Sequence, residues 1–301
     1  MGIEFDDSRV DVGRVDDRRG RGGGGLAVGG GAGVVGIIIF ILFQVLGGGS
    51  GGGGLQLPPG LDAGAGSGSG QTGETTEQLQ QRCNGQGALD QYTDCRLIKE
   101  FNIADTVWKD EFDRRGVKYQ SPTLAFFEGQ TETGCGGATA QVGPFYCPPD
   151  QKIYFDLGFL DQLQTQFGAQ GEFAQAYIVA HEFGHHLQTL LGTERQVRAA
   201  QQRNPAQQNQ YSIALELQAD CYAGMWATRA DTLDQGGLKL SAQNIAEAQK
   251  AAAAVGDDRI QAKVQGRVDP EGWTHGSAAD RQKWFTTGAQ QANLDACNTF
   301  K

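Results

Sequence analysis

Histidine is scarce in this chain of 301 residues, which contains four in total. No two of its six cysteines have the CxxC spacing of a thiolate zinc site or a thioredoxin-type redox site. Basic residues are in the minority, with 25 Lys and Arg against 35 Asp and Glu and a net charge of −10. No basic stripe is present, which argues against nucleic acid as a partner. The chemistry is therefore expected to depend on the few histidines and their neighbours.

Charge is absent from one long segment, residues 26–46, which ends in a dense apolar run. As a helix at about 1.5 Å per residue it spans roughly 30 Å, the thickness of a bilayer's hydrocarbon core. Arg18, Arg19 and Arg21 precede the segment. By the positive-inside rule the N-terminus stays in the cytoplasm and the rest is exported. A cleaved signal peptide is the alternative, but its charged region would be unusually long.

Glycine crowds the segment that follows, and this composition is typical of a flexible coil. The remainder is long enough for one domain with a sizeable core. The expected location is the cytoplasmic membrane, in a single pass, with the folded domain extracytoplasmic. The expected organisation is a cytoplasmic tail at 1–25, a transmembrane helix at 26–46, a Gly/Ser-rich linker at 47–74 and the folded domain at 75–301.

The six cysteines are expected to form disulfides, because an even number in an exported domain suits an oxidising compartment. Sequence alone leaves many connectivities open, and six unpaired thiols in a cytosolic protein are the alternative. Close spacing favours two local bridges and leaves one long-range bridge: Cys83–Cys95, Cys135–Cys147 and Cys221–Cys297.

Residue patterns predict helices, then a short sheet, then helices, which is an α+β arrangement. The two expected strands flank a Gly/Pro-rich loop that contains two of the cysteines. Helices are expected at 75–115, 172–191, 212–229 and 243–254, and strands at 121–127 and 152–157.

The HExxH sequence from His181 to His185 lies in one of these helices. Residues four apart project from the same helix face, so the two imidazoles can bind a single zinc ion. Glu182 is turned about 100° from His181, beside the metal, where it can act as general base toward a metal-activated water. The bare pattern also occurs by chance in unrelated helices. Here it contains, with His186, three of the four histidines.

A third ligand is needed, because catalytic zinc usually has three protein ligands and a water. The metzincin extension would require Gly and His at positions that hold Gln188 and Leu191, so that class is excluded. Glu216 in the next helix is the candidate third ligand. Asp220, one turn later, can accept the ring N–H of a ligating histidine and fix its tautomer. The alternative reading is two surface acids on an amphipathic helix.

Two further histidines have open roles. His186 is rotated by about 100° around the helix axis from His185. It is expected to pair with a carboxylate or to pack. His275 follows a turn and could hydrogen-bond the oxyanion of a tetrahedral intermediate, or be structural. The sequence Asp257-Asp258-Arg259 is expected to be a buried ion pair or a solvated turn and is assigned no chemistry.

Several separated sequence blocks occur in one order along the chain. They are Gly143-Pro144-Phe145-Tyr146-Cys147-Pro148, the stretch from Ala176 to Gln188 around HExxH, Glu216-Leu217-Gln218-Ala219-Asp220-Cys221-Tyr222-Ala223-Gly224, Gly256-Asp257-Asp258-Arg259, Thr274-His275-Gly276-Ser277 and Cys297-Asn298-Thr299-Phe300. With these blocks the chain resembles the membrane-anchored neutral zinc metallopeptidases of bacteria, which are similar to the gluzincins. The resemblance covers the N-terminal span, the tether and essentially all of the folded domain.

The resemblance implies an α+β, zincin-like metallopeptidase domain with a short sheet and an active-site helix, preceded by one transmembrane helix. It implies His181, His185 and Glu216 as ligands of one zinc ion per chain, Glu182 as base and Asp220 beside a ligating histidine. It does not supply a substrate.

The predicted function is zinc-dependent hydrolysis of peptide bonds outside the cytoplasmic membrane, with a peptide or protein as substrate. One alternative is a non-catalytic, zinc-stabilised, membrane-anchored binding protein, and another is a hydrolase of non-peptide amides. Retention of Glu182 favours hydrolysis over the binding protein, because a structural zinc needs no base and usually has four protein ligands.

Overall fold

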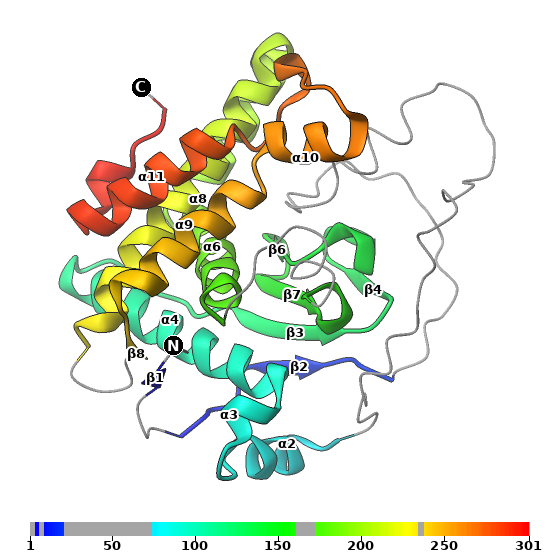
Figure 1. Ribbon diagram of the computed structural model, residues 1–301, viewed down its shortest axis with the longest axis vertical. Coiled ribbons are helices and arrows are strands. Elements are labelled where there is room, and N and C mark those ends of the chain that lie inside the picture. The colour runs from blue at the N-terminus through cyan, green and yellow to red at the C-terminus, as the bar shows by residue number, and fades with distance from the viewer. Residues whose placement is uncertain (1–3, 6–8, 21–73, 161–171, 234–237, 301) are drawn as a thin grey trace.

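The computed structural model describes residues 4–5, 9–20, 74–160, 172–233 and 238–300. Helix α6 lies at the centre, with a small sheet on one side and a layer of helices on the other (Figure 1). In that layer α11 packs against both α8 and α9 (Figure 1). The helices are α2 (Thr76–Cys83), α3 (Ala88–Gln91), α4 (Thr93–Arg114), α6 (Glu172–Leu190), α7 (Thr193–Arg203), α8 (Gln208–Asp231), α9 (Ala242–Ala254), α10 (Asp257–Gln265) and α11 (Ala278–Gln291).

The main sheet has four strands in the order β2-β3-β7-β6. Strands β2, β3 and β7 are parallel neighbours, and β6 runs antiparallel to β7 at the edge. The central strands β3 and β7 are apolar almost throughout, as expected of strands covered on both faces. The strands are β2 (Val15–Asp17), β3 (Thr123–Phe127), β6 (Phe145–Cys147) and β7 (Lys152–Asp156).

Two smaller strand pairs complete the described structure. Strands β4 (Gln130–Thr133) and β5 (Gly136–Thr139) form a hairpin. Strand β1 (Glu4–Phe5) pairs antiparallel with β8 (Leu238–Lys239), far away in the sequence. The N-terminal end of the chain is therefore attached to the domain at β1 as well as at β2.

Helices α8 and α11 cross in direct backbone contact. A Cβ atom at Gly224 would lie 1.9 Å from the carbonyl oxygen of Phe285, and one at Gly288 would lie 1.8 Å from that of Cys221. Because real Cβ atoms do not approach this closely, only glycine permits the crossing. The close approach brings residues of α11 to the middle of α8, where two of the candidate site residues lie.

The three expected disulfides are confirmed. Cys83–Cys95 joins α2 to α4, Cys135–Cys147 joins the hairpin to β6, and Cys221–Cys297 joins α8 to the last described turn.

The expected helix at 75–115 is interrupted. Gly87 has a positive φ of 73° and precedes the short helix α3, and Tyr92 has an extended backbone before α4 begins. Because glycine adopts positive φ without strain, it favours a break here. The result is three helices in place of one, with two of them joined by the first disulfide.

The expected fold class and location are corrected by the structure. Among the residues that the structure describes, no helix is long and apolar enough to cross a membrane. The predicted span at 26–46 lies outside the described residues, and the division of the chain at 25, 46 and 74 stays a prediction. The class is mixed α/β, because the sheet combines parallel and antiparallel pairs.

The N-terminal segment shows why the predicted location is wrong. Strand β2, expected in a cytoplasmic tail, is hydrogen-bonded to β3 of the domain that was expected on the other side of a bilayer. Arg18 and Arg19, read as membrane-flanking charges, instead pair with Asp16 and Asp17. Arg19 also lies 2.9 Å from Asp94 of α4. These arginines are engaged inside the fold, so they cannot serve as a topology signal.

Candidate metal centre

Helix α6 carries the HExxH sequence in the most buried part of the molecule. Its residues from Phe173 to Gln188 are all buried, and most of those outside the HExxH sequence are apolar. His181 and His185 lie one turn apart with their rings edge to face, and their Nε2 atoms are 3.3 Å apart. The two imidazoles therefore point at one location, as the spacing predicts.

Gly184 allows α6 to approach α8 closely. A Cβ atom there would lie 2.8 Å from the Cα of Ala219, which is tighter than any side chain permits. The approach places Glu216 against both imidazoles, with its Oε2 3.3 Å from Nε2 of His181 and its Oε1 3.7 Å from Nε2 of His185. Within the described ranges, these three side chains offer ligand atoms within 4.8 Å of one another.

The buried polar atoms at this location fit a divalent cation. Oε2 of Glu216 and both carboxylate oxygens of Glu182 are inaccessible to water and have no hydrogen-bond partner in the part of the chain that the structure describes. Buried polar groups without partners are costly, and a cation would satisfy the oxygen of Glu216 and leave the Glu182 carboxylate beside it. Two imidazole nitrogens and one carboxylate oxygen form the His₂Glu donor set of catalytic zinc sites.

Asp220 lies behind His181, as the sequence predicts. Its Oδ1 is 2.9 Å from Nδ1 of His181, and its Oδ2 accepts a hydrogen bond of 2.8 Å from Nε of Arg281. The hydroxyl of Tyr177, one turn before His181 on α6, also donates to Asp220. In the neutral imidazole of His181 the ring proton is thereby fixed on Nδ1, which leaves the Nε2 lone pair facing Glu216 and His185.

The pKa values of the two histidines are shifted in opposite directions. Burial would lower the pKa of His181, but Asp220 and Glu216 outweigh burial and raise it to about 9. Burial lowers the pKa of His185 to about 4. Burial would raise the pKa of Asp220, but Arg281 and His181 hold it well below its usual range. A ligating imidazole must be neutral, so cation binding would release the proton that His181 holds at neutral pH.

Glu182 adjoins the cluster and is fully buried. Burial raises its pKa to about 8, while the His181 charge and the nearby backbone N–H of Tyr146, which does not reach hydrogen-bond geometry, act in the opposite direction. A carboxyl group with a pKa this high can take up and give back a proton near neutral pH.

The other two histidines lie on different sides of the site. Nε2 of His186 is 2.6 Å from the carbonyl oxygen of Gln120, and its Nδ1 is 3.1 Å from the hydroxyl of Tyr146. His186 therefore joins α6 to the sheet, as a packing role predicts, although its partners are not carboxylates. Burial would raise the pKa of Glu216, but His185 and His181, with a smaller contribution from His275, lower it, so His275 lies within electrostatic reach of this carboxyl.

Asp257 organises the loop that carries His275. One of its oxygens accepts backbone hydrogen bonds from Thr274, His275 and Gly276, at 2.8, 2.7 and 3.0 Å. The other lies 3.2 Å from Nδ1 of His275. No chemistry was expected of Asp257 because its partners follow it by 17 residues or more, outside the reach of helix spacing.

Sequence reasoning also missed Arg281 and Tyr177. Tyr177 precedes His181 by one helical turn, which is a usable signal for a contact on the same face. Arg281 is 61 residues from Asp220 and nothing in its neighbours marks it as a partner.

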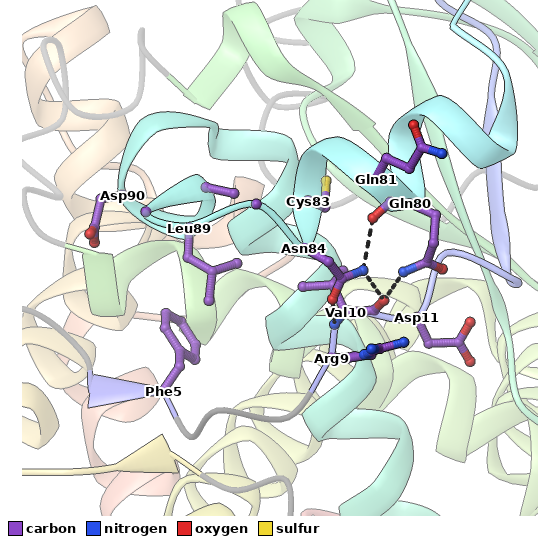
Figure 2. Close-up of a pocket in the computed structure, with 13 residues that line it drawn as sticks. Phe5, Arg9, Val10, Asp11, Gln80, Gln81, Cys83, Asn84, Leu89 and Asp90 are labelled. Carbon is purple, nitrogen blue, oxygen red and sulfur yellow. Dashed lines mark hydrogen bonds between the residues drawn. The ribbon is translucent and has the colours of Figure 1, made fainter.

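A pocket of about 1000 Å³ lies away from this cluster, between the N-terminal segment and helices α2 and α3 (Figure 2). In Figure 2 the backbone of Val10 is held by the side chains of Asn84 and Gln80. None of the residues that line this pocket belongs to the metal cluster. The pocket shows how the N-terminal segment docks on the domain, and we assign it no chemistry.

The fold and the site together define a mixed α/β protein with a buried His₂Glu metal-binding cluster on an HExxH helix. The chain belongs to the family described as "Putative neutral zinc metallopeptidase", whose model matches residues 5–300. This match confirms the resemblance seen in the sequence blocks. It supports a zinc-dependent peptidase class, with peptides as substrates, for the family as a whole.

Several relatives share this similarity across most of their length. Uncharacterized protein Rv2575 of Mycobacterium tuberculosis (strain ATCC 25618 / H37Rv) is 45% identical over 226 residues, which cover 73% of this chain and 74% of that protein. Uncharacterized protein YpfJ of Escherichia coli (strain K12) is 45% identical over 197 residues, 65% of this chain and 67% of that protein. No solved structure matches the chain.

Proposed function

We propose that this protein hydrolyses peptide bonds with one zinc ion, held by His181, His185 and Glu216, and with Glu182 as general base. The observation that carries the proposal is the Glu182 carboxylate, fully buried beside the three donors and without a hydrogen-bond partner among the described residues. A zinc site that served only as a structural staple would usually have four protein ligands and would not need this group.

The zinc ion would supply Lewis acidity, which makes a water more acidic and polarises the substrate carbonyl. Glu182 takes one proton from the attacking water while the water oxygen bonds to the carbonyl carbon. Glu182 then gives that proton to the amide nitrogen as the carbon–nitrogen bond breaks. Burial favours this shuttle because it raises the pKa of Glu182 to about 8, near the neutral range in which a carboxyl group can both take up and return a proton.

His275 is proposed to stabilise the negative charge that develops on the carbonyl oxygen. Asp257 lies against its Nδ1 at 3.2 Å and orients the ring, and an imidazole N–H aimed at the carbonyl oxygen would stabilise this charge. Removal of one such donor typically costs about 100- to 1000-fold in kcat. We expect His275→Gln to lower kcat on this scale with zinc content unchanged, as measured by steady-state kinetics and metal analysis. A loss of zinc in this variant would instead make His275 a ligand.

The general test compares cleavage of a peptide library by the wild type, Glu182→Gln and Glu216→Ala. We expect Glu182→Gln to retain about one zinc per chain and to lose hydrolysis by at least about 100-fold, because it keeps the shape of the base without its proton transfer. Glu216→Ala is expected to lose the metal itself, because it lacks the third ligand.

Three results would contradict the proposal or a part of it. Activity of Glu182→Gln equal to the wild type would remove Glu182 as base. Wild-type cleavage no greater than the Glu182→Gln background, with zinc bound, would favour a zinc-stabilised binding protein. Normal zinc content in Glu216→Ala would reassign the third ligand.

A further inference from the structure

A chain of side-chain amides leads away from His185. Oε1 of Gln188 lies 2.8 Å from Nδ1 of His185, and Nε2 of Gln188 donates to the Leu215 carbonyl oxygen at 2.7 Å and to Oε1 of Gln218 at 3.2 Å. Nε2 of Gln218 donates in turn to the carbonyl oxygen of Cys297 at 3.0 Å. Both glutamines are buried, with 1% and 6% of their surface exposed. The hydrogen bonds of this amide chain are therefore protected from exchange with water.

Backbone carbonyls fix the direction of every hydrogen bond in the amide chain. A carbonyl oxygen can only accept, so the NH₂ group of Gln188 must face Leu215, which turns its Oε1 toward His185. The carbonyl of Cys297 orients the amide of Gln218 in the same way, so that its Oε1 accepts from Gln188. The oxygen and nitrogen of an amide are often interchangeable in shape, but here the hydrogen-bond partners leave one orientation.

The orientation of Gln188 decides where the proton of His185 lies. Its Oε1 carries no hydrogen, so Nδ1 of His185 must be the donor and the lone pair must be on Nε2. This Nε2 is the atom that faces His181 and Glu216. We propose that Gln188 and Gln218 are positioning residues that hold His185 in its metal-ligating tautomer, with the carbonyls of Leu215 and Cys297 as fixed ends. The proposal rests on the metal site of the proposed function.

The same helix offers a buried glutamine for comparison. Gln175 is 5% exposed and accepts a hydrogen bond from Arg96. Within the described part of the chain, no hydrogen bond joins it to the metal cluster. Substitution of Gln175 therefore reports what loss of a buried amide from α6 does to packing alone. Substitution of Gln188 reports packing and the tautomer of His185 together.

The test measures zinc affinity of the full chain by competition with a chelator. Loss of the hydrogen-bond partner of a ligating histidine typically lowers metal affinity about 10- to 100-fold. We expect Gln188→Met, which keeps length and loses polarity, to show a loss on this scale. Gln175→Met is expected to bind zinc as the wild type does. Gln188→Glu, which as a neutral acid can still accept from His185 and donate to Leu215, is expected to recover most of the affinity.

A second measurement uses nitrogen-15 NMR of the histidine side chains in the metal-free chain. The wild type is expected to show Nε2 of His185 without a proton, and Gln188→Met a mixture of the two tautomers. Zinc affinity of Gln188→Met equal to the wild type would overturn the proposal, and so would equal losses in Gln188→Met and Gln188→Glu. If the wild type bound no zinc, the proposed function would fail, and the NMR comparison would still decide this inference.

Discussion

His181 and His185 stand one turn apart on the same helix and present the same ring atom to the same location, yet their supports are opposite in kind. Behind His181 lies a buried ion pair, Asp220 with Arg281. Behind His185 lies a neutral amide, Gln188. Both supports place the lone pair on Nε2, one through charge and the other through hydrogen-bond direction.

The two supports therefore depend on the fold in different ways. The charged support needs a counter-ion, and Arg281 supplies it from α11 with 1% of its surface exposed. A buried ion pair loses stability when one partner is removed, because the other charge remains buried. The neutral support ends on backbone carbonyls and leaves no charge behind when it is broken. Substitutions in the support of His181 should therefore lower stability most, whereas substitutions in either support should lower metal affinity.

The largest effect is expected from removal of the counter-ion. Arg281→Met leaves Asp220 charged and buried, with His181 and Tyr177 as its remaining partners among the described residues. We expect the free energy of unfolding to fall by about 3–5 kcal/mol, as measured by urea unfolding of the metal-free chain. Gln218→Met, on the neutral side, is expected to lose about 1–2 kcal/mol, because it breaks neutral hydrogen bonds alone.

A double variant separates charge from packing in this comparison. Asp220→Asn with Arg281→Met removes both charges, so it is expected to be more stable than Arg281→Met alone. If Arg281→Met were no more destabilising than Gln218→Met, the two supports would be energetically alike and the contrast would be wrong.

The pH dependence of stability should distinguish the histidines in the metal-free chain. The pKa of His181 is raised to about 9, so its stabilising contribution is complete below its unfolded value of 6.5 and is lost as pH rises through 9. The pKa of His185 is lowered to about 4, so the unfolded chain binds the extra proton and stability falls as pH drops from 6.5 to 4. Each shift corresponds to roughly 3 kcal/mol.

Two variants test this prediction in two separate pH ranges. His181→Gln should flatten the dependence of unfolding free energy between pH 6.5 and 9, and His185→Gln should flatten it between pH 4 and 6.5. The measurement is denaturant unfolding in the presence of a chelator across that range. Loss of the same window in both variants would mean that the two imidazoles titrate as one coupled pair.

Much of the site could be predicted from the sequence because its parts follow helix spacing. His181 with His185 and Glu216 with Asp220 are each pairs at i and i+4, and the structure brings the two pairs together. Which helices face each other was not readable from spacing. The close approach at Gly184 decides it.

The residues that support the two histidines could not be predicted, because they also depend on which helices face each other. Arg281 comes from a helix that the sequence pattern did not predict. In the sequence, Gln188 served only to exclude the metzincin motif, and nothing indicated its contact with His185. Their roles depend on what lies opposite them in space. An amide acquires direction only from acceptors such as the Leu215 carbonyl, and no pattern along the chain encodes that contact.

The sequence predicted the central strands and the HExxH helix, and it missed the shortest strand of the main sheet. The expected strands at 121–127 and 152–157 correspond to β3 and β7, and the expected helix at 172–191 corresponds to α6. Strand β2 has three residues, too few for alternation to be read, and its parallel pairing with β3 joins segments more than a hundred residues apart. The N-terminal segment was therefore assigned to a tail.

The smallest effect is expected where the neutral support meets the disulfide Cys221–Cys297. The Cys297 carbonyl orients Gln218, and the bridge holds this carbonyl against α8. Replacement of both cysteines by alanine should weaken zinc binding about threefold, below the range for loss of a direct partner, because the effect passes through two amides. The matched control replaces Cys83 and Cys95, whose bridge joins α2 to α4, and should leave zinc affinity unchanged. Chelator competition measures the zinc affinity of both variants. Equal losses of affinity would show that the bridges act through general stability. The neutral support would then end at Leu215 and would not extend to the disulfide.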